Sequence, residues 1–199
     1  MKQLIAALLS IAPVLAFGET ATWNVDASHS TVGFSVRHLV ISNVKGEFTK
    51  YAGKVLLDEK DVARSSVEAS IDVGSIDTRS ADRDGHLKSP DFFDVAKFPA
   101  ITFKSTKVAK AGKDRLRVTG DLTLHGVTKA VTLDVRASPE VKGLYGEARR
   151  AYSATVKLDR KDYGLVWNKV VEAGPAVGDE VTITLDLEAV KDAPKAAAK

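Results

Sequence analysis

The sequence predicts an all-β protein built on an antiparallel sheet, and three observations support this prediction. Apolar and polar residues alternate along most of the 199-residue chain, as in strands that bury only one face. Glycine-containing turn signals separate the alternating stretches at short intervals, for example at His125-Gly126 and Lys142-Gly143. Strands with one apolar face and short connections form antiparallel rather than parallel sheets.

The alternation is clearest in six stretches. In one of them Val67, Ala69 and Ile71 alternate with Glu68 and Ser70. The same period of two fills residues 31–38, 66–73, 115–124, 131–137, 152–159 and 181–189, and it is weaker in residues 44–50, 52–58 and 101–108. The chain is therefore expected to form eight or nine strands.

The apolar face of such a sheet must be hidden, which leaves two architectures. The sheet closes into a barrel, whose interior is filled by side chains or holds one small ligand, or it splits into a sandwich. Several residues expected to face inward are small, among them Ala69, Gly120, Ala137 and Ala154. Small inward residues favour a barrel with a cavity.

Residues 77–95 do not alternate, and we predict a short helical segment near residues 80–95. Residues 80–87 are expected to form a helix capped by Thr78 or Ser80. A second helical turn is expected after it, with Ser89 as the N-cap and Pro90 at the first helical position.

The beginning of the chain has the pattern of a secretory signal peptide. A positive start with Lys2 precedes an apolar run over residues 4–17, and small residues occupy positions 16 and 18. We expect cleavage after Gly18, a folded domain over residues 19–190 and a disordered Ala/Lys-rich tail over residues 191–199. A retained N-terminal anchor is the alternative.

Composition excludes several classes of function. The chain has no cysteine, so it forms no disulfide, thiolate zinc site or iron–sulfur cluster and has no thiol nucleophile. Its net charge of +3 is too small for a dedicated nucleic-acid-binding protein.

The four histidines do not have the spacing of a metal-binding pair, so no metal site is expected. His125 is interpreted as a turn residue. His29 lies in a polar corner with Asp26 and Ser28, and His38 shares the apolar face of its strand. An exported hydrolase with His29 or His38 as its base is therefore the alternative function, although the chain lacks the Gly-x-Ser-x-Gly motif.

A second polar group lies in the predicted helix. Arg79, Arg83 and His86 have spacings of four and three, so they project from one helix face. This face is either solvated or an anion site at the mouth of a barrel. Phe92 and Phe93 follow closely and are expected to form a plug that lines the cavity. Outside this segment, Trp167 is expected to cover a barrel end or to meet another subunit.

An ordered set of motifs between Trp23 and Val190 resembles the YceI-like family of exported bacterial lipid-binding proteins. The motifs are Trp23-Asn24-Val25-Asp26 with His29-Ser30, Phe34-x-Val36-x-His38, Gly46-x-Phe48, Ser75-Ile76-Asp77-Thr78, Arg83-Asp84-x-His86-Leu87-x-Ser89-x-Asp91-Phe92-Phe93-Asp94, Phe98-Pro99-x-Ile101-x-Phe103, Gly120-x-Leu122-Thr123-x-x-Gly126-Val127-Thr128 and Arg160-x-Asp162-Tyr163-Gly164. The resemblance implies an eight-stranded lipocalin-like barrel, often paired as a homodimer. It further implies an apolar tunnel for a polyisoprenoid or another long-chain amphiphilic lipid, without catalytic residues or a cofactor.

The predicted function is thus that of a periplasmic binding protein that transports, stores or sequesters such a lipid, with transient membrane contact but no stable insertion. We expect His38 and Arg83 to contact the polar end of the ligand. The full set of expected ligand-binding residues is Phe34, Val36, His38, Phe48, Ile71, Val73, Arg83, His86, Phe92, Phe93, Phe103, Leu122, Leu124 and Trp167.

Overall fold

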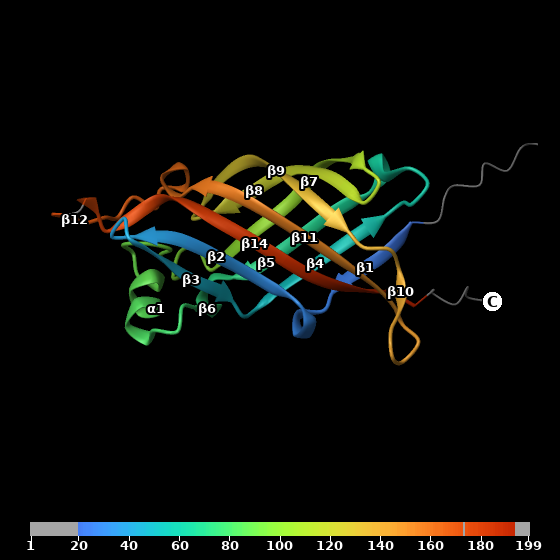
Figure 1. The fold of residues 1–199 in the computed structure, drawn as a ribbon, viewed down its shortest axis with the longest axis horizontal. Helices are drawn as coiled ribbons and strands as arrows, with labels where there is room; N and C mark the ends of the chain where they lie inside the picture. Colours follow the sequence, from blue (N-terminus) through green and yellow to red (C-terminus); the bar gives the residue numbers. More distant parts are fainter. Residues whose placement is uncertain (1–19, 173, 194–199) are drawn as a thin grey trace, which may run out of the picture.

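Eight antiparallel strands form a closed barrel in the computed structural model, which describes residues 20–172 and 174–193 (Figure 1). Neighbours around the ring follow the order β11-β9-β8-β7-β5-β4-β1-β14, and pairing of β11 with β14 closes it. The eight strands are β1 (Ala21–Val25), β4 (Tyr51–Leu57), β5 (Ser66–Asp72), β7 (Ala100–Gly112), β8 (Arg115–Leu124), β9 (Val127–Ala137), β11 (Ala148–Asp159) and β14 (Val177–Lys191). Closure confirms the barrel and removes the sandwich alternative.

Strand β14 closes the barrel because it is long enough to pair with three other strands. Its 15 residues span about 50 Å at roughly 3.3 Å per residue. One edge pairs with β11, and the other pairs first with β2 (Thr31–His38) and then with β1. β3 (Ser42–Phe48) pairs with β2, and β6 (Ile76–Asp77) pairs with β3, so the sheet extends beyond the ring beside β14.

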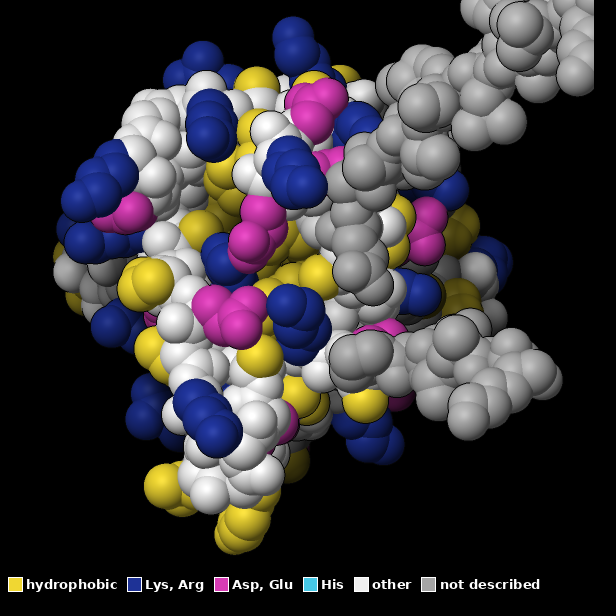
Figure 2. Space-filling model, turned by 90° about the vertical axis from the view of Figure 1, so that its right-hand side faces the viewer, with side chains coloured by type: hydrophobic (Ala, Val, Ile, Leu, Met, Phe, Trp, Pro, Cys, Tyr) yellow, Lys and Arg dark blue, Asp and Glu magenta, His cyan; other side chains and the backbone are white. Residues whose placement is uncertain are grey.

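The two ends of the barrel are covered by different segments of the chain. We call the end covered by residues 73–99 and 160–178 the lid end; helix α1 (Ala81–Lys88) lies there (Figure 1). The opposite end, the Trp23 end, carries short connections and the β10 (Val141–Lys142) to β11 hairpin. Figure 2 faces the Trp23 end and shows Lys, Arg, Asp and Glu side chains around apolar ones. The remaining short elements are η1 (Ala27–His29), η2 (Val62–Arg64), η3 (Val73–Ser75), η4 (Arg160–Tyr163), β12 (Val170–Val171) and β13 (Gly174–Pro175).

The single predicted α-helix is present, and the second helical turn predicted after Ser89 is a hydrogen-bonded turn that does not continue as a helix. The Ser89 carbonyl accepts hydrogen bonds from the N–H groups of Phe92 at 3.1 Å and Asp94 at 2.9 Å, and Ser89 Oγ accepts one from the Asp91 N–H at 3.3 Å, as an N-cap does. Ser80 occupies the N-cap position of α1 without a side-chain cap. Among the described residues, no helix has both the length and the apolar character required to cross a membrane.

Strand β1 was not predicted, although Ala21, Trp23 and Val25 alternate with Thr22 and Asn24. The final strand also runs further than the alternation indicated. Lys191, which was assigned to the tail, ends β14, and the Asp192 N–H donates to the Thr22 carbonyl at 2.8 Å. The proposed signal peptide and residues 194–199 of the tail lie outside the described residues.

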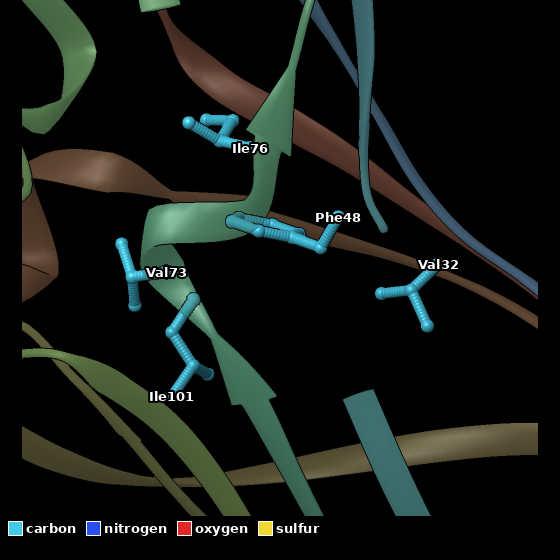
Figure 3. Packing of buried hydrophobic residues seen from close by; sticks show 5 residues of the cluster. All are labelled: Val32, Phe48, Val73, Ile76 and Ile101. Atoms are coloured by element: carbon cyan, nitrogen blue, oxygen red, sulfur yellow. The ribbon is translucent and has the colours of Figure 1, made fainter. Parts of the chain in front are cut away.

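The core comprises two apolar clusters, one toward each end of the barrel. Val32, Phe48, Val73, Ile76 and Ile101 pack together on the side that faces the lid (Figure 3). Trp23, Leu57, Tyr152 and Ala189 form the cluster of the Trp23 end. The space between the two clusters is where an internal cavity lies.

Glycine makes room for a ring in the barrel wall. A Cβ at Gly120 would lie 2.5 Å from both the Lys104 carbonyl oxygen and the Phe103 ring. Phe103 thus occupies the space beside Gly120, so this small residue accommodates an aromatic neighbour and does not itself line the cavity.

Candidate functional site

An apolar cavity of about 290 Å³ runs inside the barrel. At roughly 30 Å³ of liquid volume per water molecule, it has room for about ten waters, far more than a packing defect. All eight barrel strands contribute to its lining, and Leu87, Phe92 and Phe93 close it toward the lid end. Such a space is shaped for an apolar ligand.

The pleat of the strands makes the cavity apolar. On β5, Val67, Ala69 and Ile71 face the cavity, whereas Ser70 is exposed on the other face. The same face continues into β7, because Ile71 lies directly opposite Ile101 of that strand. Residues directly opposite each other share one sheet face, so the alternation of each strand adds to one continuous apolar surface.

Aromatic rings line the cavity toward the lid end. The ring centres of Phe34 and Phe48 lie 5.8 Å apart, and Phe48 meets Phe93 edge-on at 6.2 Å. Phe93 comes from the segment that follows α1, whereas Phe34 and Phe48 come from β2 and β3. The lid segment is therefore part of the cavity wall.

Nine of the fourteen residues predicted to bind ligand line the cavity. These are Phe34, Val36, Phe48, Ile71, Phe92, Phe93, Phe103, Leu122 and Leu124. Five others lie outside the lining: His38, Val73, Arg83, His86 and Trp167. Val73 is fully buried in the core cluster, and His38 is the last residue of β2, beside the turn.

The polar and aromatic residues of the lid are engaged with one another. Arg83 donates from Nε to Thr78 Oγ1 and from Nη2 to the Thr78 carbonyl, each at 2.8 Å. The His86 ring lies edge-on to both Phe92 at 5.0 Å and Trp167 at 4.8 Å. Arg83 thus secures the loop before α1, and Trp167 covers the lid from the 160–178 segment.

The chain's residues 23–189 match the YceI-like domain family. The chain belongs to the YceI-like family. A UPF0312 protein of Vibrio parahaemolyticus is 37% identical over 195 residues, which cover 96% of this chain and 98% of the relative.

Solved structures agree with this YceI-like barrel. BcnA of Burkholderia cenocepacia matches with a TM-score of 0.74 and 26% identity, over 82% of this chain and 98% of that chain. A polyisoprenoid-binding domain from Saccharophagus degradans matches with a TM-score of 0.63 and 18% identity, over 87% of this chain and all of that one, which shows the same fold.

Sequence reasoning omitted several cavity residues of this YceI-like protein whose signal was present. Tyr152, Ala154, Val156 and Leu158 line the cavity from β11. Their alternation had already placed them on one apolar face, but they were not included in the set of expected ligand-binding residues. The inward face of a barrel strand is best assigned as a whole.

Asp26, Ser28 and His29 do not form a catalytic relay. Ser28 Oγ donates to Asp26 Oδ1 at 2.6 Å, and His29 Nδ1 lies 2.9 Å from Asp26 Oδ2 and 3.0 Å from Ser28 Oγ. A serine-hydrolase relay uses opposite ring nitrogens for the nucleophile and the carboxylate. Here both partners share Nδ1, and neither His29 nor His38 lines the cavity.

An arginine occupies the position between the carboxylates of the same corner. Ligand atoms of Asp26, His29 and Glu188 lie within 4.8 Å of one another. Arg149 Nη1 donates to Asp26 Oδ2 at 2.9 Å and to Glu188 Oε1. Because the Arg149 guanidinium already lies between these carboxylates and pairs with both, the corner is an ion-pair network that joins β11, β14 and η1.

This network predicts an acid-sensitive contribution to stability. Hydrogen bonds from Ser28, His29 and Arg149 hold the pKa of Asp26 well below its usual range. A carboxyl with a depressed folded-state pKa stabilises the fold above its unfolded value of about 3.9, and this contribution is lost as the pH falls further. We expect Asp26→Asn to be less stable at pH 7 and to lose less stability between pH 5 and pH 2 than the wild type.

Urea unfolding at several pH values measures this difference. Asp134→Asn is the control, because Asp134 is an exposed carboxylate paired with the exposed Arg117. Parallel pH profiles for the wild type and Asp26→Asn would contradict the assignment.

Proposed function

We propose that this YceI-like protein is a non-catalytic carrier of a long-chain amphiphilic lipid, of the polyisoprenoid class, which it holds without a cofactor. The observation that carries the proposal is the apolar cavity enclosed by the barrel. The Saccharophagus degradans domain is described as polyisoprenoid-binding, and the proposal extends this ligand class to the present chain.

Simple energetics favours such a ligand. Each CH₂ group that leaves water gains roughly 0.8 kcal/mol, so an isoprene unit gains about 4 kcal/mol. A long prenyl chain is thus held strongly by an apolar wall, and a few polar groups suffice to orient its head.

Native mass spectrometry of freshly purified protein, with analysis of its organic extract, tests the proposal. We expect a co-purifying prenyl-type lipid and no turnover of ester substrates. An extract free of lipid, together with failure to bind a prenyl alcohol, would reject the carrier function. Ester turnover would instead favour the hydrolase alternative.

We propose that the protein acts in the periplasm after removal of residues 1–18. The apolar run and the small residues at positions 16 and 18 support export. N-terminal sequencing of the exported protein should begin at Glu19; a sequence beginning at Met1 would contradict cleavage.

We propose transient membrane contact through the tip of the β10–β11 hairpin. Leu144 and Tyr145 are 96% and 93% exposed there, and the hairpin projects from the Trp23 end (Figure 1). Tyrosine favours the membrane–water interface, and Lys142 adds a cation beside it.

The double substitution Leu144→Ser with Tyr145→Ser should reduce flotation with anionic vesicles at least fivefold, because it removes the apolar anchor. A matched control, Ile41→Ser with Val170→Ser, changes exposed apolar residues at the lid end. Equal flotation of both double variants would refute the hairpin as the contact.

We propose a homodimer formed through the lid end. Val40, Ile41, Val170 and Val171 are exposed there, on two neighbouring hairpins. Leu39 and Val40 have φ of 49° and 63°, although such turns favour Asn-Gly. Apolar residues kept in a strained turn are better explained by a contact than by turn chemistry.

Sedimentation velocity should show pairs for the wild type and about tenfold weaker association for Ile41→Ser with Val170→Ser. The Leu144→Ser, Tyr145→Ser variant serves as its control. Dimers of undiminished stability in the lid-end variant would place the interface elsewhere.

A further inference from the structure

The barrel wall is only partly paired between β9 and β11. Their ladder comprises three residue pairs, formed by residues 152–154 with residues 135–137. Among the described residues, 127–134 of β9 and 155–159 of β11 have no partner across this junction. By contrast, β11 pairs with β14, and β9 with β8, along almost their full lengths. We call the unpaired stretch, which lies toward the lid end, the β9–β11 seam.

The seam differs from the neighbouring junctions in what holds the strands together. Main-chain hydrogen bonds join paired strands, and a fully paired barrel has no free strand edge. Separating β9 from β8 would break a ladder of ten residue pairs. Widening the seam breaks no ladder bond, because the pairing of β9 with β11 has already ended there. The seam therefore widens at less cost than the paired junctions on either side of it.

The seam lies over the cavity. Val131 and Leu133 line the cavity from β9, and Val156 and Leu158 line it from β11. Val156 and Leu158 are partly exposed, whereas Ala154, at the end of the ladder, is buried. A widened seam thus joins the apolar interior to the surface without passing through the lid.

Outward side chains beside the seam are bound to the strand behind them. On β9, Asp134 Oδ1 accepts a hydrogen bond from Arg117 Nε of β8 at 3.2 Å. On β11, Lys157 Nζ lies 2.8 Å from Glu180 Oε1 of β14. Each side of the seam therefore keeps these contacts when the seam widens.

Contacts at the lid end join the two sides of the seam. Lys129 Nζ of β9 donates to Asp162 Oδ1 of η4, the element that follows β11, at 2.6 Å. His125 Nδ1, in the turn before β9, lies 3.1 Å from the Tyr163 carbonyl oxygen. Both side chains of the Lys129–Asp162 pair are exposed, and exposed ion pairs are weak. This pair can therefore break and form again as the seam moves.

We propose that the β9–β11 seam is a lateral gate through which a prenyl chain enters and leaves the cavity, with the Lys129–Asp162 pair as its latch. This inference rests on the carrier function proposed above and adds the route that the ligand takes. The gate is closed in both the empty and the loaded protein. It therefore sets a barrier common to entry and exit, which changes both rates by one factor and leaves the affinity unchanged.

Cross-linking the latch tests the gate, because the chain has no cysteine of its own. The double variant Lys129→Cys with Asp162→Cys is linked by a reducible bis-methanethiosulfonate reagent. Stopped-flow mixing with dansyl-labelled geranylgeraniol measures association, and a chase with unlabelled geranylgeraniol measures release. We expect the link to slow both rates about tenfold or more and to change Kd less than about twofold, and reduction should restore both rates. Lys129→Met, which only removes the latch, should raise both rates about two- to fivefold.

The matched control is Arg117→Cys with Asp134→Cys. These residues are also exposed and ion-paired, but they lie directly opposite each other on the paired strands β8 and β9. The same link there should leave both rates as in the wild type. Unchanged rates in the cross-linked latch variant, slower association without slower release, or equal slowing by both links would overturn the gate and leave the carrier function intact. Wild-type protein that does not bind the probe would overturn both proposals.

Discussion

Ile71→Asp should abolish binding of a prenyl chain while the barrel still folds. Ile71 faces the cavity from β5, between Tyr51 of β4 and Ile101 of β7. In the ligand-free barrel the cavity admits water to the new carboxylate, which limits the cost to the fold. A bound prenyl tail would remove that water, and an unpaired buried charge is very unfavourable. We expect affinity for geranylgeraniol to fall at least 100-fold, which is about 2.7 kcal/mol.

Ser70→Asp is the control for this substitution. It places the same charge one residue away, on the exposed face of β5. It should bind the prenyl chain like the wild type, and circular dichroism should show both variants folded. A folded Ile71→Asp variant with wild-type affinity would mean that the ligand does not occupy this part of the cavity.

The inward faces of the strands were predictable because burial acts on one face of each strand. A shift of one residue would expose Ile71, Phe103 and Leu122 together, so the alternation fixes which face is inside. Closure of the barrel, in contrast to the inward faces of the strands, could not be predicted from local patterns. The pairing of Arg149–Asp159 with Glu180–Val190 joins distant parts of the chain, and no local pattern specifies it.

For the polar residues, spacing along the sequence was not enough to predict which side chains face the cavity. Spacing placed Arg83 and His86 on one helix face, but it did not show which way that face points; Arg83 binds Thr78 instead of facing the cavity. The alternation along β2 correctly predicted the cavity-lining residues up to Val36. His38 has the same parity but ends the strand and does not line the cavity. The same alternation places Arg150 on the inward face of β11, the face that carries Tyr152. That signal was missed because the alternation was read only from Tyr152 onward.

Arg160→Met should destabilise the lid end more than any other single change of a polar residue considered above. Arg160 is 5% exposed and follows β11 directly. Its Nε donates to the Gly178 carbonyl and its Nη1 to the Trp167 carbonyl, each at 2.9 Å. Nη1 also donates to the Leu165 carbonyl, and Nη2 donates to Asp179 at 3.2 Å. One guanidinium thus joins both sides of the loop that carries Trp167.

Methionine preserves much of the volume but donates no hydrogen bond, so several buried carbonyl groups lose their partner. We expect the free energy of unfolding to fall by about 3–5 kcal/mol, the usual cost of removing one partner from a buried charged network. Lys161→Met is the control: Lys161 pairs with the same Asp179 but is 49% exposed, so its loss should cost roughly 0–1 kcal/mol. Urea unfolding followed by tryptophan fluorescence reports on Trp167 at the lid end together with Trp23 at the opposite end. Coincident transitions for Arg160→Met and Lys161→Met would show that the lid is held by its apolar contacts with His86 and Phe92 rather than by the buried arginine.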